Sequence, residues 1–131
     1  MDELLIESGD DVVRVRQRVR AVAADSGLSL VDQTKLVTAA SELARNALIH
    51  GGGGTARVEL ATSAAGRAGI RVTFSDSGPG IADVDLALTD GWTTGDGLGL
   101  GLSGARRLVD EFELVSKPGQ GTSVAVAKWS R

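Results

Sequence analysis

The spacing of apolar residues predicts two helices in the first half of the chain. In the first, apolar residues from Val12 to Ala23 recur at intervals of three and four, which places them on one helical face. Asp10 or Asp11 lies near the start of this helix and Gly27 marks its end. Arginines at positions 14, 16, 18 and 20 occupy its other sides, where they form either a solvated surface or a docking surface for a partner.

The second predicted helix runs from Ser29 or Asp32 to His50. Its buried stripe consists of four apolar residues at helical spacing, Leu36, Ala40, Leu43 and Ala47. The glycine run at 51–54 is similar to a phosphate-binding loop, but no Gly-Lys-Ser/Thr sequence follows it. We therefore interpret this run as the end of the helix and a turn.

A period of two replaces the helical period in much of the remaining chain. Alternating or short apolar segments predict strands at 4–6, 58–60, 70–74, 114–116 and 122–128, of which the second and third are expected to pair antiparallel. A last helix is predicted from Leu102, Ala105, Val109 and Phe112, with Ser103 as its cap. Residues 81–88 show a weak helical pattern, and the polar segment 89–96 predicts a lid over about 82–98.

This order of elements predicts an α+β fold. We expect a two-layer α/β sandwich, with a mixed, largely antiparallel sheet and helices on one face. The length of 131 residues is that of a single domain, residues 1–131, and a composition of 42% hydrophobic and 24% charged residues is typical of a compact protein.

Composition and charge exclude several classes of function. The chain has no cysteine and one histidine, so a protein-held zinc site is not expected and any metal should be bound by oxygen. A net charge of -3 and an aromatic content of 3% argue against a nucleic-acid partner. Because the chain shows neither a long apolar run nor a basic start, we expect a cytoplasmic protein without a membrane partner.

The polar side of the second helix is the first candidate for chemistry. Glu42, Asn46 and His50 recur every four residues and therefore stack on one side of the helix. Taken alone, they are equally typical of a solvated polar face.

A second candidate follows the predicted strand 70–74. Asp76 is followed by Ser77-Gly78-Pro79-Gly80, a tight turn whose glycines let the backbone approach a ligand closely. A carboxylate in this position accepts a hydrogen bond either from an exocyclic amine such as that of adenine or from its own turn.

The third candidate is the glycine-rich stretch at 97–104, which leads into the last predicted helix. Its backbone N–H groups and the helix N-terminus favour a phosphate. Gly99, Gly101 and Gly104 also satisfy the dinucleotide fingerprint G-x-G-x-x-G, but a polar segment precedes them and only 27 residues follow. A dinucleotide-binding crossover unit therefore has no room. The His-Arg-Asp and Asp-Phe-Gly motifs of eukaryotic-type protein kinases are also absent.

The three candidates together, in this order, resemble the motifs of the GHKL ATPases, the family of gyrase, Hsp90, histidine kinases and MutL. The matching segments are Glu42-Leu-Ala-Arg-Asn46-Ala-Leu-Ile-His50 (the N box), Asp76-Ser-Gly78-Pro-Gly80, Gly97-Leu-Gly99-Leu-Gly101 and Gly121-Thr122. The resemblance covers nearly the whole chain and implies the Bergerat ATP-binding fold, with ATP and Mg²⁺ as cofactors.

The resemblance also implies roles for individual residues. Asn46 would hold Mg²⁺ on the triphosphate, Glu42 would act as base or orient the attacking hydroxyl, and Asp76 would read the adenine amine. One asparagine suffices as the protein ligand because phosphates and water fill most of the Mg²⁺ shell. Further nucleotide contacts are implied for His50, Gly78, Gly80, Ile81, Gly97, Leu98, Gly99, Leu100, Gly101, Leu102 and Thr122.

Within this family, the small size, the short lid and the segment 41–46 most resemble the bacterial serine kinases and anti-sigma factors of partner-switching pathways. The segments 90–95, 107–112 and 127–131 are similar to the stressosome switch kinases of the general-stress sigma-factor pathway. The Gly99-Leu-Gly101 sequence and His50 resemble the anti-sigma and histidine-kinase branches instead.

Two hypotheses of function follow from this resemblance. In the first, the chain is a serine/threonine kinase that phosphorylates STAS-domain scaffold or antagonist proteins and, when released, activates a PP2C-type phosphatase. In the second, it is an anti-sigma factor or another partner-binding protein ordered by ATP, with little or no kinase activity. Neither hypothesis decides whether the chain forms a homodimer. Because the single histidine lies in the N box, self-phosphorylation on histidine is not expected.

Overall fold

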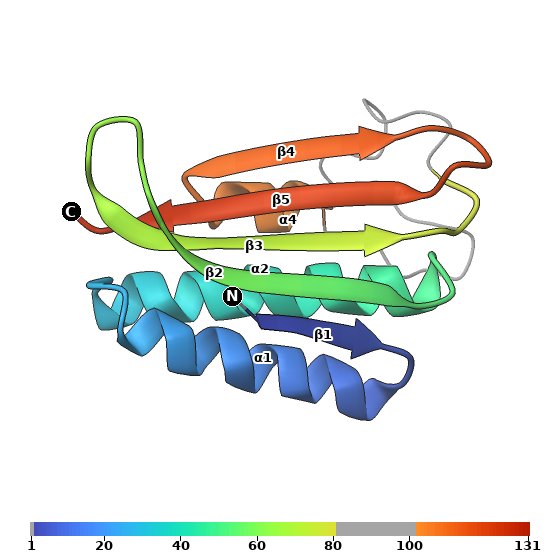
Figure 1. Ribbon diagram of the computed structural model, residues 1–131, viewed down its shortest axis with the longest axis horizontal. Coiled ribbons are helices and arrows are strands. Elements are labelled where there is room, and N and C mark those ends of the chain that lie inside the picture. The colour runs from blue at the N-terminus through green and yellow to red at the C-terminus, as the bar shows by residue number, and fades with distance from the viewer. Residues whose placement is uncertain (1, 81–101) are drawn as a thin grey trace.

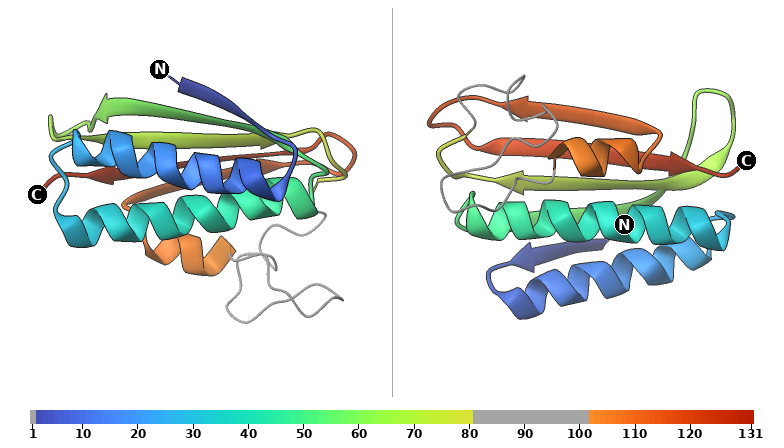
Figure 2. Two further views of the ribbon diagram at one scale, coloured as in Figure 1. Left: turned by 90° about the horizontal axis from the view of Figure 1, so that it is seen from below. Right: turned by 180° about the vertical axis from the view of Figure 1, so that it is seen from behind.

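The computed structural model describes residues 2–80 and 102–131, which form a sheet covered by helices on one face (Figures 1 and 2). The strands are β1 (Asp2–Ile6), β2 (Gly54–Thr62), β3 (Ala68–Asp76), β4 (Glu111–Ser116) and β5 (Thr122–Trp129). The helices are α1 (Gly9–Ala24), α2 (Leu30–Ile49) and α4 (Leu102–Arg107). The strand order is β1-β2-β3-β5-β4, and every neighbouring pair among these strands is antiparallel. The predicted two-layer α+β sandwich is therefore confirmed.

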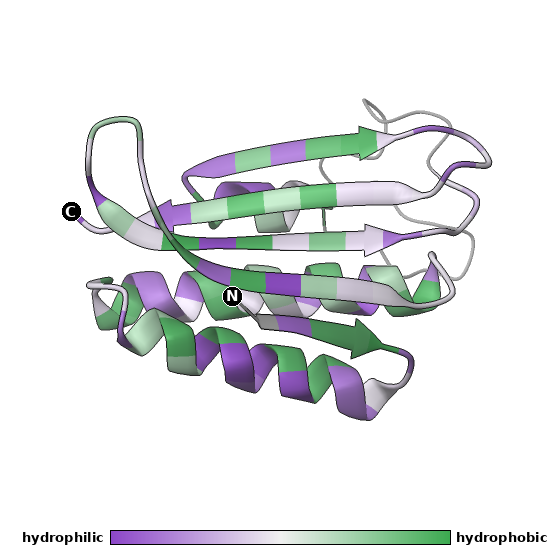
Figure 3. Ribbon diagram, in the orientation of Figure 1, coloured by the Kyte–Doolittle hydropathy of each residue, from purple (hydrophilic) through white to green (hydrophobic). Residues whose placement is uncertain are grey.

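The core lies between the sheet and the helices. Residues alternate between hydrophilic and hydrophobic along the strands (Figure 3), so that one face of the sheet is apolar. Ile70, Val72 and Phe74 of β3 are buried on this face and belong to the same apolar cluster as Val15 of α1 and Leu43 of α2. Full burial of each such side chain stabilises the folded state by about 1.5–3 kcal/mol. The alternation predicted from the sequence thus determines which face of the sheet meets the helices.

Both ends of α2 follow from local sequence. The Ser29 hydroxyl accepts a hydrogen bond from the Asp32 N–H at 3.1 Å, as expected for an N-cap. At the other end, the Gly53 N–H donates to the Ala47 carbonyl at 2.8 Å, and Gly52 and Gly53 have φ values of 74° and 110°. Glycine adopts this left-handed region without strain. The interpretation of the glycine run as a helix end and turn is confirmed.

The last predicted helix is wrong at its C-terminal end. The helix ends at Arg107, and Phe112, which we expected on its apolar face, lies in β4 opposite Val126 of β5. The Asp110 N–H donates to the Ala127 carbonyl at 2.9 Å, so the chain has joined the sheet before Phe112. Phe112 fits both a helical period and the alternation of β4, and pairing with β5 decides between them. Ser103 lies within this helix rather than before it.

A buried charge network holds the end of the sheet where β5 finishes. Lys128 is only 4% exposed, and its ammonium lies 3.4 Å from a carboxylate oxygen of Asp110 and 3.7 Å from one of Asp32. The Trp129 N–H donates to the other Asp110 oxygen at 2.8 Å, and Arg131 donates to this carboxylate at 2.9 Å. A buried cation needs such partners, because an unpaired charge is costly to remove from water.

Asp110→Asn is expected to lower the free energy of unfolding at pH 7 by about 1 kcal/mol, since solvent screens the exposed Arg131 but not Lys128. Burial raises the pKa of Asp110, but the Trp129 hydrogen bond and the charges of Lys128 and Arg131 outweigh burial and hold the pKa below its usual range. The carboxylate therefore stabilises the fold above its unfolded pKa, and this contribution is lost as the pH falls through the folded pKa.

Urea unfolding of wild type and Asp110→Asn across pH 2–7 measures this dependence. The difference in the free energy of unfolding between the two proteins should shrink below about pH 4. Asp25→Asn, which alters an exposed carboxylate at the end of α1, is the control and should show no such trend. A difference that stays constant with pH would contradict the assignment.

Within the described ranges, no helix combines the length and apolar character needed to cross a bilayer.

Candidate functional site

The C-terminal ends of α2 and β3 and the start of β5 all lie at one end of the molecule (Figure 1). Residues from these three ends line a pocket. Its described lining residues are Leu43, Asn46, Ala47, His50, Gly51, Phe74, Asp76, Gly80, Leu102, Thr122 and Val124. An apolar lining with a few converging polar groups is typical of a small-molecule site. The structure thus brings together six of the residues selected from the sequence: Asn46, His50, Asp76, Gly80, Leu102 and Thr122.

The last two turns of α2 present Leu43, Asn46 and Ala47 to the pocket, and the C-cap residue His50 follows them. Asn46 and His50 are half-buried and supply an amide and an imidazole, while Leu43 and Ala47 beside them are buried in the core. The α2 helix ends at this point, and the Asn46 carbonyl accepts hydrogen bonds from the N–H groups of His50 and Gly51 at 2.9 and 3.2 Å. The polar stripe found in the sequence therefore faces the pocket at its C-terminal end.

Glu42, the first member of this stripe, is placed differently. It is not among the described residues that line the pocket. Its carboxylate accepts a hydrogen bond from the Arg45 guanidinium at 2.9 Å, and the two side chains are 41% and 45% exposed. Glu42 therefore lies beside the pocket, at the surface of α2.

Asp76 is the last residue of β3 and is held in the middle of the sheet. Its register partners are Gly54 of β2 and Thr122 of β5. One carboxylate oxygen, Oδ1, accepts a hydrogen bond from the Gly78 N–H at 2.9 Å, which closes the turn. Asp76 is thus the turn-capping residue that the sequence suggested, and the same side chain also lines the pocket.

Glycines pack closely around Asp76. A Cβ atom at Gly51 would lie 2.6 Å from Oδ2 of Asp76, and one at Gly78 would lie 2.7 Å from Cα of Gly51. Gly80 has a φ of 77°, and a Cβ atom there would collide with the Lys117 carbonyl. The sequence predicts Gly51 only as part of the helix end and turn. Its position directly after the polar stripe was the available signal that it also belongs to the site.

Thr122 is fixed by a hydroxyl pair. Its Oγ1 lies 2.8 Å from Oγ of Ser116, and the Ser116 hydroxyl also lies 3.2 Å from the Gly121 carbonyl. Thr122 lies directly opposite Asp76 across β3 and β5. The two side chains therefore line the same part of the pocket.

The remaining predicted site residues lie outside the described residues. These are Ile81, Gly97, Leu98, Gly99, Leu100 and Gly101, together with the weak helix at 81–88 and the lid at about 82–98. Within residues 2–80 and 102–131, no three His, Cys, Asp or Glu side chains are grouped so as to hold a metal ion. A metal at this pocket would take most of its ligands from a bound molecule and water, with the Asn46 amide oxygen as a protein ligand.

Comparison with known proteins identifies close relatives. The model of the family described as histidine kinase-, DNA gyrase B-, and HSP90-like ATPase matches residues 31–130. The serine/threonine-protein kinase RsbT of Bacillus subtilis (strain 168) is 43% identical over 121 residues, which cover 92% of this chain and 90% of RsbT. The anti-sigma F factor of Thermoanaerobacter sp. (strain X514) is 31% identical over 119 residues, which cover 87% of this chain and 82% of that protein.

Solved structures share the fold at lower identity. The RsbU and RsbW domains of a Mycobacterium tuberculosis protein match the whole chain with a TM-score of 0.64 and 24% identity, and this chain spans 33% of that chain. The catalytic domain of the histidine kinase ThkA matches 99% of this chain and 97% of its own, with a TM-score of 0.54 and 14% identity.

Proposed function

Because the chain belongs to the family of histidine kinase-, DNA gyrase B- and HSP90-like ATPases, we propose that it is a serine/threonine-protein kinase that transfers phosphate from ATP to a separate protein. The observation that carries this proposal is the pocket around Asp76, which is lined by six of the residues expected to bind ATP or its metal: Asn46, His50, Asp76, Gly80, Leu102 and Thr122. The 43% identity with RsbT over most of both chains supports serine or threonine as the acceptor.

The chemistry of the pocket fits a purine nucleotide. Phe74 and Val124 supply apolar contacts for the base, and Asp76 keeps Oδ2 as an acceptor for the adenine amine while Oδ1 caps the turn. Thr122, opposite Asp76, completes the polar contacts to the base. We place His50 and the glycine turn at Gly78 and Gly80 beside the nucleotide. Ile81 and residues 97–102 complete the proposed binding site.

Asn46 is the residue that we assign to Mg²⁺. Its amide oxygen is a hard ligand of the kind that Mg²⁺ prefers, and the ion takes its other ligands from phosphates and water. When bound, Mg²⁺ offsets the negative charge of the triphosphate. Glu42, one turn before Asn46 on α2, is assigned to the acceptor hydroxyl, which it orients and from which it accepts the proton.

The proposed acceptor is a STAS-domain protein of a partner-switching pathway that acts in the cytoplasm. When released from this protein, the kinase would activate a PP2C-type phosphatase. An anti-sigma role, in which ATP orders a surface that binds a sigma factor, is the alternative, and the 31% identity with an anti-sigma F factor favours it. We also leave a homodimer open as the functional form.

Labelled ATP distinguishes these functions. The purified chain is incubated with γ-labelled ATP, Mg²⁺ and, separately, the STAS-domain, phosphatase and sigma-factor proteins of the same genome. We expect label on a serine or threonine of the STAS-domain protein, together with binding of the phosphatase by the released kinase. Binding of a sigma factor without transfer of label to any chain would support the alternative and contradict the kinase.

Asn46→Ala is expected to weaken Mg-ATP binding by about twofold to tenfold, the range for loss of one hydrogen bond or ligand contact. Calorimetric titration with ATP in the presence and absence of Mg²⁺ measures this loss. The loss should be larger with Mg²⁺, because the assigned contact is to the ion. Thr38→Ala, an exposed polar residue earlier on α2, is the control. An equal loss in the absence of Mg²⁺ would contradict the assignment of Asn46 to the metal.

A further inference from the structure

The ion pair between Glu42 and Arg45 lies on the side of α2 that turns away from the pocket. Successive residues of an α-helix are rotated by about 100°, so Asn46 lies about 40° from Glu42 in one direction and Arg45 about 60° in the other. Leu43, Asn46, Ala47 and His50, which line the pocket, all lie in the first direction. Arg45 therefore draws the Glu42 carboxylate away from the pocket, where Glu42 contributes no lining.

We propose that Arg45 is a positioning residue that restrains Glu42 outside the pocket and thereby limits phosphoryl transfer until the ion pair is broken. This inference rests on the proposed role of Glu42 as the proton acceptor. The guanidinium is always charged and donates to the carboxylate at 2.9 Å, so the pair competes with any hydroxyl for the same acceptor oxygen. Rotation of the Glu42 side chain away from Arg45 frees that oxygen.

Hydrolysis of ATP by water measures the restraint without a partner protein. In this reaction a water oxygen forms a bond to the γ-phosphorus, the bond from that phosphorus to the ADP oxygen breaks, and the water proton passes to Glu42, which gives ADP and phosphate. Both exposed partners limit the strength of the pair, which falls in the range of surface ion pairs. Its removal should therefore raise the population of released Glu42, and with it the rate, by about twofold to fivefold.

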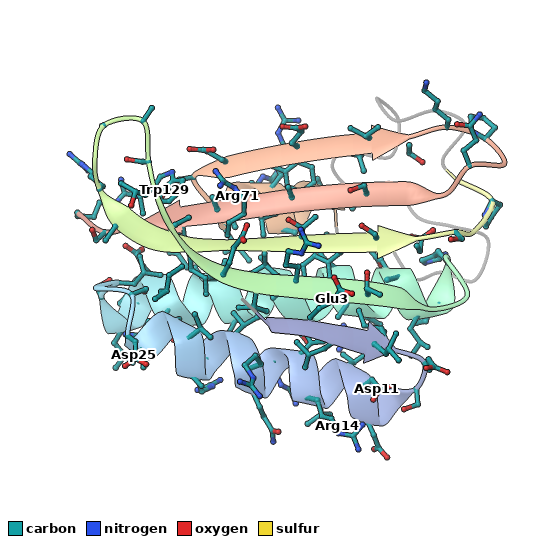
Figure 4. The ribbon with its side chains drawn as sticks, in the orientation of Figure 1. Glu3, Asp11, Arg14, Asp25, Arg71 and Trp129 are labelled. Atoms are coloured by element: carbon teal, nitrogen blue, oxygen red, sulfur yellow. The ribbon has the colours of Figure 1, made fainter. Side chains whose placement is uncertain are left out.

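The experiment compares Arg45→Gln, Arg45→Lys and Arg14→Gln in the full chain. Arg45→Gln should raise kcat for ATP hydrolysis by about twofold to fivefold without changing the Kd of ATP, and Arg45→Lys should stay near wild type because it retains a cation. Arg14→Gln is the control, since the exposed Arg14 forms an ion pair with Asp11 at the same i,i+3 spacing on α1 (Figure 4). It should leave kcat unchanged.

Two further measurements show whether the effect passes through Glu42. In the double variant Glu42→Gln/Arg45→Gln, kcat should equal that of Glu42→Gln alone. In the nucleotide-free protein, ¹³C NMR should show a shift of the Glu42 carboxyl signal in Arg45→Gln and none in Arg14→Gln. The NMR shift shows that Arg45 contacts Glu42 in solution, and kcat shows whether the contact matters for hydrolysis, because a merely structural ion pair would change unfolding but leave kcat unchanged.

The outcomes separate this inference from the proposed function. If Glu42→Gln hydrolyses ATP more slowly than wild type but Arg45→Gln behaves like Arg14→Gln, the restraint is refuted and the role of Glu42 stands. A lower kcat in Arg45→Gln, or an increase that persists in the double variant, also refutes the restraint. If Glu42→Gln hydrolyses ATP at the wild-type rate, both the assigned role of Glu42 and the restraint are refuted.

Discussion

Glu42→Gln is expected to reduce phosphoryl transfer to a protein acceptor by about 10²–10⁴-fold, the range for loss of a general base. Glutamine keeps the size of the side chain but accepts no proton from the attacking hydroxyl. Because Glu42 lies beside the pocket rather than among its lining residues, the Kd of ATP should remain unchanged. The variant therefore separates ATP binding, which should be unchanged, from phosphoryl transfer, which should be lost.

Single-turnover transfer from labelled ATP to a STAS-domain protein measures the loss, and titration with ATP measures the affinity. Glu113→Gln, which changes an exposed glutamate on β4, is the control and should transfer phosphate at the wild-type rate. Transfer by Glu42→Gln at the wild-type rate would remove the assigned role as base. Loss of ATP binding in the variant would instead place Glu42 in the nucleotide site.

The sequence predicted the fold well where one periodic pattern decided each element. The helical spacing in α1 and α2 and the alternation in β2 and β3 each had a single reading, and local signals such as Ser29 fixed a terminus. Phe112 was predicted on the last helix from its spacing from Val109, but its alternation with Glu111 and Glu113 also fits a strand. Only the non-local pairing of β4 with β5 decides between them, and no local pattern contains that information.

The sequence predicted the polar members of the site together with Gly80 and Leu102, and it missed the other apolar lining residues and Gly51. Asn46 was predicted because it recurs with Glu42 and His50 on one side of the helix, and Asp76 because it ends an apolar strand and precedes a glycine turn. Phe74 and Val124 looked like ordinary core residues, since a strand residue that faces a helix and one that faces a cavity have the same pattern. Gly51 was assigned to chain reversal, and its contact with Asp76, distant in sequence, is visible only in the folded chain.

The matching family motifs also could not show how Glu42 is held. The N box gives the order of Glu42, Arg45 and Asn46 along α2, but the ion pair depends on side-chain directions. Residues three apart and four apart are both neighbours on a helix. The Glu42 side chain can therefore turn toward either Arg45 or Asn46. The structure places it with Arg45. This placement is the observation on which we base the proposal that Arg45 restrains Glu42, the assigned base, until the ion pair is broken.

Asp76→Asn is expected to weaken ATP binding by about tenfold to a hundredfold, the range for loss of a hydrogen bond to a charged group. The carboxylate has two acceptor oxygens, and Oδ1 is already engaged by the Gly78 N–H. Asparagine has one acceptor oxygen. Asparagine can therefore accept a hydrogen bond from the Gly78 N–H or from the adenine amine, but not from both. Its NH₂ group then faces the donor that the oxygen does not accept from.

Calorimetric titration with ATP and with GTP tests this assignment. The loss for ATP in Asp76→Asn should exceed that for GTP, because guanine carries an oxygen at the position of the adenine amine and has no hydrogen bond to lose there. Asp25→Asn, at the exposed end of α1, is the control and should bind ATP as wild type does. Thermal unfolding without nucleotide checks that the turn still folds. An equal loss for both nucleotides would mean that Asp76 supports the glycine turn but does not read the base.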